Sequence, residues 1–318
     1  MPLGDCFVSV ITLNTVLGSI YSLIDSSMTF YEHALHIENM RFMFDYKPKI
    51  AENKDAPEAH EGDIVLDHVS FSYFGSKEKA LDNFSLTIHK GEKIAIVGQN
   101  GAGKTTLTKL LLRLYDPTEG SISINGTDIR DVNLKSYRNL FATVLQDYRH
   151  FSISVKDNIL LRREQPGDDA LIADALQKST ADVFVDTFPL GVDSILDREF
   201  DDNGEILSGG QAQMISIAHV HAKGSPIVIL DEPASALDPI AEQKMYKNMM
   251  ASAVNKTVVF ISHRMSACLH ADRIVVLDHG RIIECGSHLE LMKKNGRYSE
   301  LFRMQSEHYV DNKKEGRC

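Results

Sequence analysis

This 318-residue chain has few cysteines, fewer positive than negative charges and no evident targeting sequence. Its four cysteines (Cys6, Cys268, Cys285 and Cys318) are scattered without the spacing of a metal site or a disulfide framework, which is typical of a protein in a reducing cytosol. Lys and Arg number 34 against 44 Asp and Glu, and the net charge of −10 argues against nucleic acid as the main partner. No signal-peptide pattern and no internal repeat are visible. The composition of the whole chain, 43% hydrophobic and 25% charged, is ordinary for an intracellular globular protein.

A glycine-rich octapeptide fits the phosphate-loop pattern G-x-x-x-x-G-K-[ST]: Gly98-Gln99-Asn100-Gly101-Ala102-Gly103-Lys104-Thr105. The apolar run 94–97 before it predicts a buried strand, and the apolar spacing of 105–112 predicts a helix. Such a strand, glycine turn and helix N-terminus direct backbone N–H groups at one point, which favours an anion. Lys104 is then expected to reach the β- and γ-phosphates of a nucleotide, and the Thr105 hydroxyl to ligate Mg²⁺. A glycine turn that merely joins strand to helix is the alternative, and the rarity of the pattern disfavours it.

Two adjacent carboxylates end a second apolar run, at 227–230. Asp231, at the C-terminal end of a predicted strand, suits a Mg²⁺ ligand, either direct or through another ligand. Glu232 lies where a base could polarise an attacking water. A strand that runs into a polar turn would be a reasonable alternative if this segment stood alone.

The segment Leu207-Ser208-Gly209-Gly210-Gln211 separates one family from the other phosphate-loop proteins. With these motifs, the chain resembles the nucleotide-binding half of an ATP-binding cassette (ABC) transporter over roughly residues 63–300. The likeness is greatest to the exporter type, in which membrane helices and ATPase share one polypeptide. The resemblance implies hydrolysis of ATP with Mg²⁺ by a head-to-tail pair of cassettes. Each nucleotide would then lie between Lys104 of one subunit and Ser208 of the other.

The resemblance also implies roles for residues outside these motifs. Tyr73 matches the aromatic residue that stacks on adenine, although its spacing alone favours a core residue equally. Residues 235–238 match the loop that crosses to the partner subunit. The implied catalytic residues are Lys104, Gln146, Glu232 and His263, and the implied metal ligands are Thr105, Gln146 and Asp231. The implied nucleotide-binding residues are Tyr73, Gly98, Asn100, Gly101, Ala102, Gly103, Lys104, Thr105, Thr106, Ser208, Gly209, Gly210 and Gln211.

The order of the elements predicts an α/β fold. Residues 63–90 and 121–126 are expected to form a small antiparallel sheet with a hairpin turn at Asn125-Gly126. Residues 135–215 are expected to be mostly helical and to carry Gln146 and the signature. A mostly parallel sheet with helices on both faces is expected from the runs 94–97, 227–230, 258–261 and 274–277. The expected fold is a P-loop NTPase (RecA-like) core with a small antiparallel β-subdomain and a helical signature subdomain, preceded by an N-terminal helix.

The first 46 residues differ in character. Residues 6–24 carry no charge and 12 of the 19 are apolar, yet six are Ser, Thr or Asn, which is polar for a lipid-facing span. The pattern turns amphipathic over 26–46, and Lys47-Pro48-Lys49 is expected to end the helix. Through the resemblance, this segment is expected to be the end of the last membrane helix and its cytoplasmic extension. An amphipathic helix packed on the globular domain is the alternative.

The expected domains are the terminal part of a transmembrane domain (1–46), a linker (47–62), the ABC nucleotide-binding domain (63–305) and a polar tail (306–318). Residues 312–318 of this tail are expected to be disordered. One helix cannot build a translocation path, so other membrane helices must come from another chain or from a missing N-terminal segment. The expected function is export of a peptide, lipid or drug-like molecule across the inner or plasma membrane, with the ATPase facing the cytoplasm. The expected partners are a second cassette, identical or not, and the transporter's membrane helices. A stand-alone ATPase subunit serving a separate permease, or a non-transport ABC ATPase, is the alternative.

Two segments depart from the family's pattern. Residues 212–219 lack the arginines that family members usually place after the signature, and 201–205 replace the usual exporter loop before it. These changes bear on coupling to the membrane partner and on packing of the signature helix. The nucleotide chemistry is expected to be intact, because every residue that the resemblance assigns to it is present.

Overall fold

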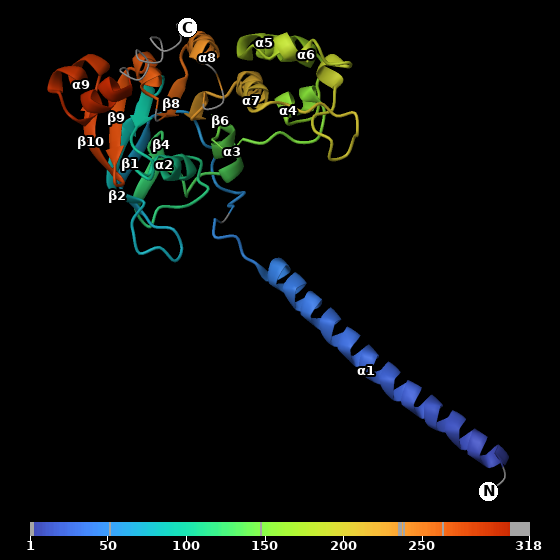
Figure 1. Ribbon diagram of the computed structural model, residues 1–318. Coiled ribbons are helices and arrows are strands. Elements are labelled where there is room, and N and C mark those ends of the chain that lie inside the picture. The colour runs from blue at the N-terminus through green and yellow to red at the C-terminus, as the bar shows by residue number, and fades with distance from the viewer. Residues whose placement is uncertain are drawn as a thin grey trace. The chain divides into compact units, whose positions relative to one another are not determined.

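The computed structural model describes residues 3–50, 52–146, 148–234, 237, 239–262 and 264–305 (Figure 1). The chain divides into two compact units, Met1–Ala51 and Glu52–Cys318, and each is described by itself. The predicted polar tail at 306–318 lies outside the described residues.

The first unit is one uninterrupted helix, α1 (Leu3–Asp45). All of its described side chains are exposed, apolar and polar alike. Several hydroxyls of this helix bond within it: those of Thr12, Thr15 and Ser19 donate to the carbonyl four residues back, at 2.8, 2.9 and 2.9 Å. By length and composition, the stretch Phe7–Asp45 meets the requirement for crossing a membrane.

A six-stranded, mostly parallel sheet forms the centre of the second unit, in the order β10-β9-β3-β8-β7-β6. Its strands are β3 (Lys93–Val97), β6 (Phe141–Val144), β7 (Ile227–Asp231), β8 (Thr257–Ser262), β9 (Arg273–Asp278) and β10 (Arg281–Gly286). The four predicted runs are its central strands, which confirms the predicted core. β10 is antiparallel to β9 at one edge, and β6 is parallel to β7 at the other.

The edge strand β6 interrupts the stretch 135–215 that the sequence predicted as mostly helical, and Gln146 follows this strand rather than lying on a helix. A four-residue segment is too short for its periodicity to distinguish strand from helix. It becomes a strand because the exposed edge of β7 offers it backbone hydrogen-bonding partners.

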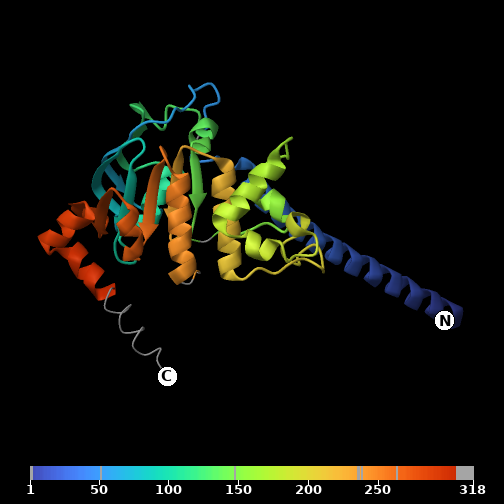
Figure 2. The same cartoon turned by 90° about the horizontal axis from the view of Figure 1, so that it is seen from above.

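Both faces of the parallel sheet are buried, and successive side chains enter two different hydrophobic clusters. In β7, for example, Ile227 and Ile229 face one cluster while Val228 and Leu230 face the other. The first cluster includes α2 (Lys104–Leu111) and the small antiparallel sheet. The second includes α7 (Gly209–Lys223) and α8 (Pro239–Ser252), which run alongside the sheet in Figure 2.

The predicted antiparallel sheet is present, in the order β2-β1-β4-β5. Its strands are β1 (Ile64–Phe71), β2 (Leu81–Ile88), β4 (Glu119–Ile124) and β5 (Thr127–Asp128). Asn125 and Gly126 join β4 to β5 with φ values of 49° and 79°, the left-handed pair that a tight hairpin turn requires. The hairpin prediction is therefore confirmed.

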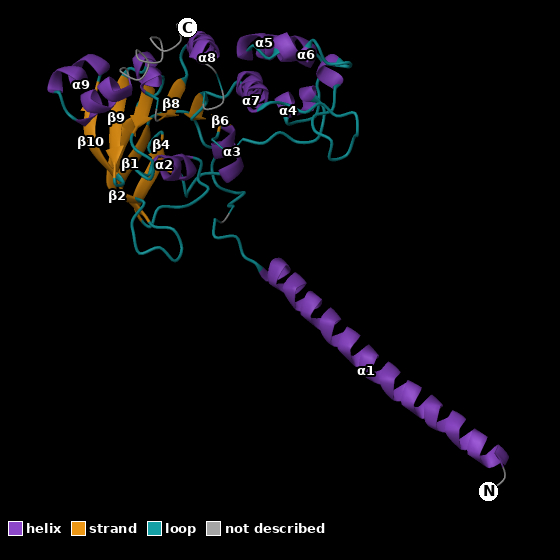
Figure 3. Ribbon diagram, viewed as in Figure 1, coloured by secondary structure: helices purple, strands orange, loops and turns teal. Residues whose placement is uncertain are grey.

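A subdomain without sheet strands carries the signature. It contains α4 (Val155–Leu160), α5 (Asp168–Ser179), α6 (Asp182–Val185), the 3₁₀ turn η1 (Gly191–Asp193) and α7. These elements enclose a hydrophobic cluster of their own, to which Ile159, Leu176 and Ile215 contribute. Figure 3 shows them as a group of helices beside the block of strands. The remaining helical elements are α3 (Leu134–Asn139), η2 (Met265–His270), α9 (His288–Lys294) and helical turns at 297–305.

Candidate nucleotide-binding site

The glycine loop connects β3 to α2, as the sequence predicted. Two of its glycines are required by close backbone approaches. A Cβ on Gly98 would lie 2.3 Å from the Leu277 carbonyl oxygen, and one on Gly103 would lie 2.6 Å from that of Ala80. Gly103 also has a φ of 105°, which side-chain-bearing residues rarely adopt. The loop is therefore held against β9 and the start of β2 in a shape that only glycine permits.

Lys104, the first residue of α2, has its ammonium group inside this loop. Its Nζ donates to the carbonyl oxygens of Gly98 and Gln99, at 2.9 and 3.0 Å. Burial lowers the pKa of Lys104, and the nearby charges of Glu232 and Asp231 partly oppose that shift. A largely buried cation at the N-terminus of a helix is a strong site for an anion.

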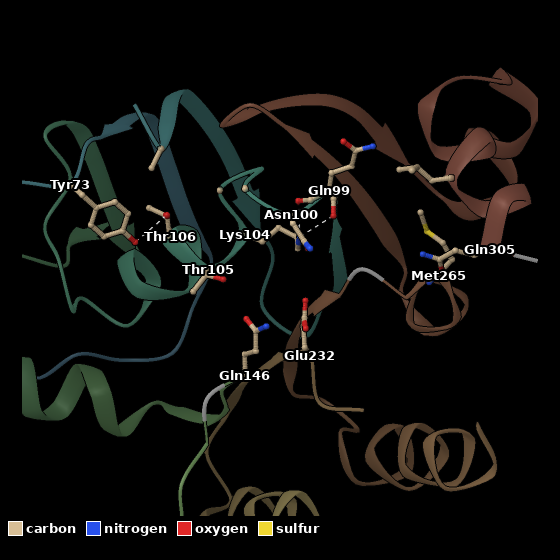
Figure 4. A pocket seen from close by; sticks show the side chains of 15 residues that line it. Tyr73, Gln99, Asn100, Lys104, Thr105, Thr106, Gln146, Glu232, Met265 and Gln305 are labelled. Carbon is tan, nitrogen blue, oxygen red and sulfur yellow. Dashed lines mark hydrogen bonds between the residues drawn. The ribbon is translucent and has the colours of Figure 1, made fainter. Parts of the chain in front are cut away.

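A cavity of about 990 Å³ opens beside the loop (Figure 4). Its wall is built from the loop, the start of α2, and single residues from distant parts of the chain. The lining residues are Tyr73, Ala80, Gly98, Gln99, Asn100, Gly101, Gly103, Lys104, Thr105, Thr106, Gln146, Glu232, Met265, Leu301 and Gln305. Most of the predicted nucleotide-binding residues therefore share one cavity, and Ala102 is buried next to it.

Asp231 lies behind the loop and is not part of the cavity wall. It ends β7 almost completely buried, and the Thr108 hydroxyl of α2 donates to its Oδ2 at 3.2 Å. The carboxylate thus ties the end of β7 to the helix that carries Lys104 and Thr105.

The next residue, Glu232, lines the cavity in a strained conformation. Its φ is 52°, in the left-handed region that costs a non-glycine residue about 1 kcal/mol or more. Two hydrogen bonds hold it there: its N–H donates to the Ile261 carbonyl at 2.8 Å, and its carbonyl accepts from Gln213 Nε2 at 3.2 Å. In Figure 4 the side chains of Glu232 and Gln146 both point toward the phosphate loop.

Tyr73 lies at the far end of the cavity, two residues beyond β1. Its hydroxyl is 3.2 Å from Thr106 Oγ1. Its ring meets the rings of Phe71 and Tyr115 edge to face, with centroids 5.0 and 5.6 Å away. The ring is therefore fixed by its neighbours while one part of it faces the cavity.

The signature residues lie elsewhere, at the start of α7. Ser208 caps the helix: its Oγ accepts from the Gln211 N–H at 3.3 Å, and Gln211 Oε1 accepts from the Ser208 N–H at 2.9 Å. Ser208, Gly209, Gly210 and Gln211 do not line the cavity. The single chain therefore does not bring the signature to its own phosphate loop.

Some predicted residues lie outside the described part of the chain, and some lining residues were not predicted. His263, and Ser235, Ala236 and Asp238 of the loop expected to reach the partner, belong to the first group. Met265, Leu301 and Gln305 belong to the second. Gln305 Oε1 accepts from the Met265 N–H at 2.9 Å. No local sequence pattern predicts this part of the cavity wall, because Met265 and Gln305 are 40 residues apart in the chain.

A strand, a glycine loop holding a buried lysine, and a helix that continues with Thr105 define a P-loop nucleoside-triphosphate-binding domain. Residues 81–235 match the family model described as ABC transporter. The chain is 38% identical over 263 residues to the ATP-dependent lipid A-core flippase of Vibrio parahaemolyticus, covering 83% of this chain and 44% of the flippase. It is 36% identical over 311 residues to YgaD of Bacillus subtilis, named as a multidrug export ATP-binding/permease protein, covering 96% of this chain and 52% of YgaD.

A solved structure, that of a bacterial Atm1-family ABC exporter with ATP bound, superposes with a TM-score of 0.79 at 34% identity, covering 87% of this chain and 48% of that one. The chain therefore belongs to the ABC transporter family and carries its ATP-binding domain. It spans about half the length of the relatives it matches.

Proposed function

We propose that the chain hydrolyses ATP to drive export of a molecule across a membrane. The observation that carries this proposal is the cavity in which Lys104, Gln146 and Glu232 meet the phosphate loop. Lys104 supplies a fixed positive charge for the β- and γ-phosphates, and the loop's backbone N–H groups supply further donors. Tyr73 supplies an aromatic surface for the base at the other end of the cavity.

Glu232 is proposed to orient the attacking water, and His263 to contact the γ-phosphate. The strained backbone at Glu232 supports its part of this proposal, because such strain persists where the surrounding structure over-determines a position. Here β8 and α7 supply that constraint, through the Ile261 carbonyl and the Gln213 amide.

The residues proposed to hold Mg²⁺ fit that ion. Thr105 and Gln146 both line the cavity and offer a hydroxyl and an amide oxygen, and Asp231 places a carboxylate behind them. Oxygen donors of this kind are what Mg²⁺ prefers, with phosphate oxygens and water completing its shell. When bound, the ion supplies positive charge that stabilises the transferring phosphoryl group.

A second cassette is proposed to complete the site. The two Gly residues at the start of the 15-residue α7 present backbone N–H groups that suit an anion, yet they lie off their own chain's cavity. A head-to-tail pair would place Ser208 of one subunit against the nucleotide held by Lys104 of the other. The names of the relatives, which describe exporters and combined ATP-binding/permease proteins, support such an assembly with membrane helices.

Residues 1–46 are proposed to be the end of the last membrane helix and its cytoplasmic extension. At about 1.5 Å per residue, the 43 residues of α1 extend roughly 65 Å, about twice the hydrocarbon thickness of a bilayer. Its exposed apolar side chains need a covering of lipid or of other helices. Because the Thr12 and Thr15 hydroxyls bond to the helix backbone, these two polar side chains are compatible with a membrane. The nucleotide-binding domain, 63–305, then faces the cytoplasm, joined by the linker 47–62.

Two measurements test this proposal. The full chain in detergent should hydrolyse ATP, Lys104→Ala should abolish nucleotide binding, and Lys135→Ala, an exposed control on α3, should not. ATP affinity that survives Lys104→Ala would refute the assigned loop. In cells, the chain should pellet with membranes and resist a carbonate wash. A fully soluble chain would favour a stand-alone ATPase subunit instead.

A further inference from the structure

Lys109, a residue of α2 outside every motif above, lies against the aromatic ring of Tyr73. Its Nζ is 5.4 Å from the ring centroid and over the ring, within the range of a cation–π contact. Lys109 is one helical turn beyond Thr106, whose hydroxyl meets the Tyr73 hydroxyl. The same helix therefore holds both the tip and the face of the tyrosine.

The ring has little freedom to respond to this contact. The rings of Phe71 and Tyr115 meet the Tyr73 ring edge to face, at interplanar angles of 84° and 85°. These two rings also pack against each other, with their centroids 5.3 Å apart. Phe71 is 5% exposed, so this aromatic cluster is anchored in the core. The Tyr73 ring is thus held in place by neighbouring side chains of the protein.

Tyr73 lines the cavity, whereas Lys109 does not. Because the ammonium group lies over one face of the ring, a base that stacks on Tyr73 would take the other face. The face of an aromatic ring carries negative potential that repels the π-cloud of a stacked base. A cation on one face draws that density away from the other, which favours stacking of an electron-rich purine there.

We propose that Lys109 is a positioning residue of the nucleotide site, which strengthens purine stacking by acting through Tyr73. This inference rests on the proposed function, because it takes ATP as the ligand of the cavity. Its contribution concerns the base and not the phosphates. An effect of Lys109 on base stacking can therefore be distinguished from the general attraction that any nearby lysine exerts on a triphosphate.

The test compares ATP with inorganic tripolyphosphate, which carries the phosphates without the base, on the full chain in detergent. Lys109→Gln should weaken ATP binding about threefold and leave tripolyphosphate binding unchanged. Lys109→Arg, which keeps the cation, should restore ATP affinity. In a Tyr73→Ala background, Lys109→Gln should have no further effect.

Each other outcome has a definite meaning. Equal weakening of ATP and tripolyphosphate would show that Lys109 acts on the phosphates, and would overturn the inference. Unchanged ATP affinity in Lys109→Gln would overturn it as well. If the unmodified chain bound tripolyphosphate but showed no preference for ATP, the nucleotide function itself would fail. Thermal unfolding of each variant checks that the fold is kept.

Discussion

The side-chain amide of Gln213 donates to the backbone carbonyl of Glu232, across 3.2 Å and 19 residues of sequence. Gln213 is completely buried in α7, the helix that Ser208 caps, and Glu232 follows β7. The bond therefore joins the signature helix directly to the residue proposed to orient water. A movement of α7 would reach the strained backbone at Glu232 without any intermediate residue.

This contact predicts that Gln213→Leu, which keeps the volume and removes the donor, will lower kcat for ATP about tenfold and change KM by less than twofold. It should also cost about 1–3 kcal/mol of stability, because the carbonyl loses a buried partner. Steady-state kinetics and chemical denaturation measure the two effects. Gln177→Leu, on the exposed side of α5, serves as the control. A kcat equal to that of the unmodified chain would show that the contact has no part in turnover.

The close approach at Gly98 predicts that Gly98→Ala will weaken ATP binding more than tenfold. The added methyl would lie 2.3 Å from the Leu277 carbonyl, so the loop must shift away from β9, and such overpacking costs about 1–3 kcal/mol. Isothermal titration with ATP measures the loss. Gly18→Ala, on α1, where the added Cβ meets nothing within 4 Å and no positive φ is required, should leave affinity unchanged. Full affinity in Gly98→Ala would contradict the rigid loop described above.

The buried position of His221, on α7, predicts that the free energy of unfolding falls in mild acid. Burial, aided by the charges of Lys178 and Lys256, lowers the pKa of His221 to about 4 from 6.5. Because the folded pKa lies below the unfolded one, the unfolded chain binds more protons between these values. Stability is therefore complete above about pH 6.5 and falls as the pH drops toward 4.

Between pH 7.5 and 5, this single group should cost about 1–2 kcal/mol. Urea denaturation of the unmodified chain and of His221→Gln at both pH values isolates it, since every other titrating group is shared. Between the two pH values, the free energy of unfolding of the unmodified chain should fall by more than that of His221→Gln. Parallel pH curves would mean that His221 titrates normally in the folded state.

The parts of the molecule that sequence could predict are those set by local chemistry. The strand, glycine loop and helix around Lys104 follow from one continuous segment, and the hairpin at Asn125-Gly126 follows from two residues that tolerate positive φ. The central strands were recognisable because a strand buried on both faces is apolar throughout.

What sequence could not predict depends on contacts between distant segments. β6 is a strand only because β7 lies beside it, and Met265 and Gln305 form one wall only because the fold brings them together. The Lys109–Tyr73 contact joins α2 to a loop 36 residues earlier, and neither side chain signals the other in sequence. The roles of the site residues and the domain boundaries stay predictions, to be decided by experiment.

The most direct test of the whole account is the rate of ATP hydrolysis by Glu232→Gln, measured together with its ATP-dependent dimerisation in an analytical ultracentrifuge. The substitution keeps the size of the side chain and removes the carboxylate that would orient water. We predict that the variant binds ATP normally, loses nearly all turnover and accumulates as a closed dimer. Undiminished hydrolysis would contradict the role of Glu232 and the site built around it.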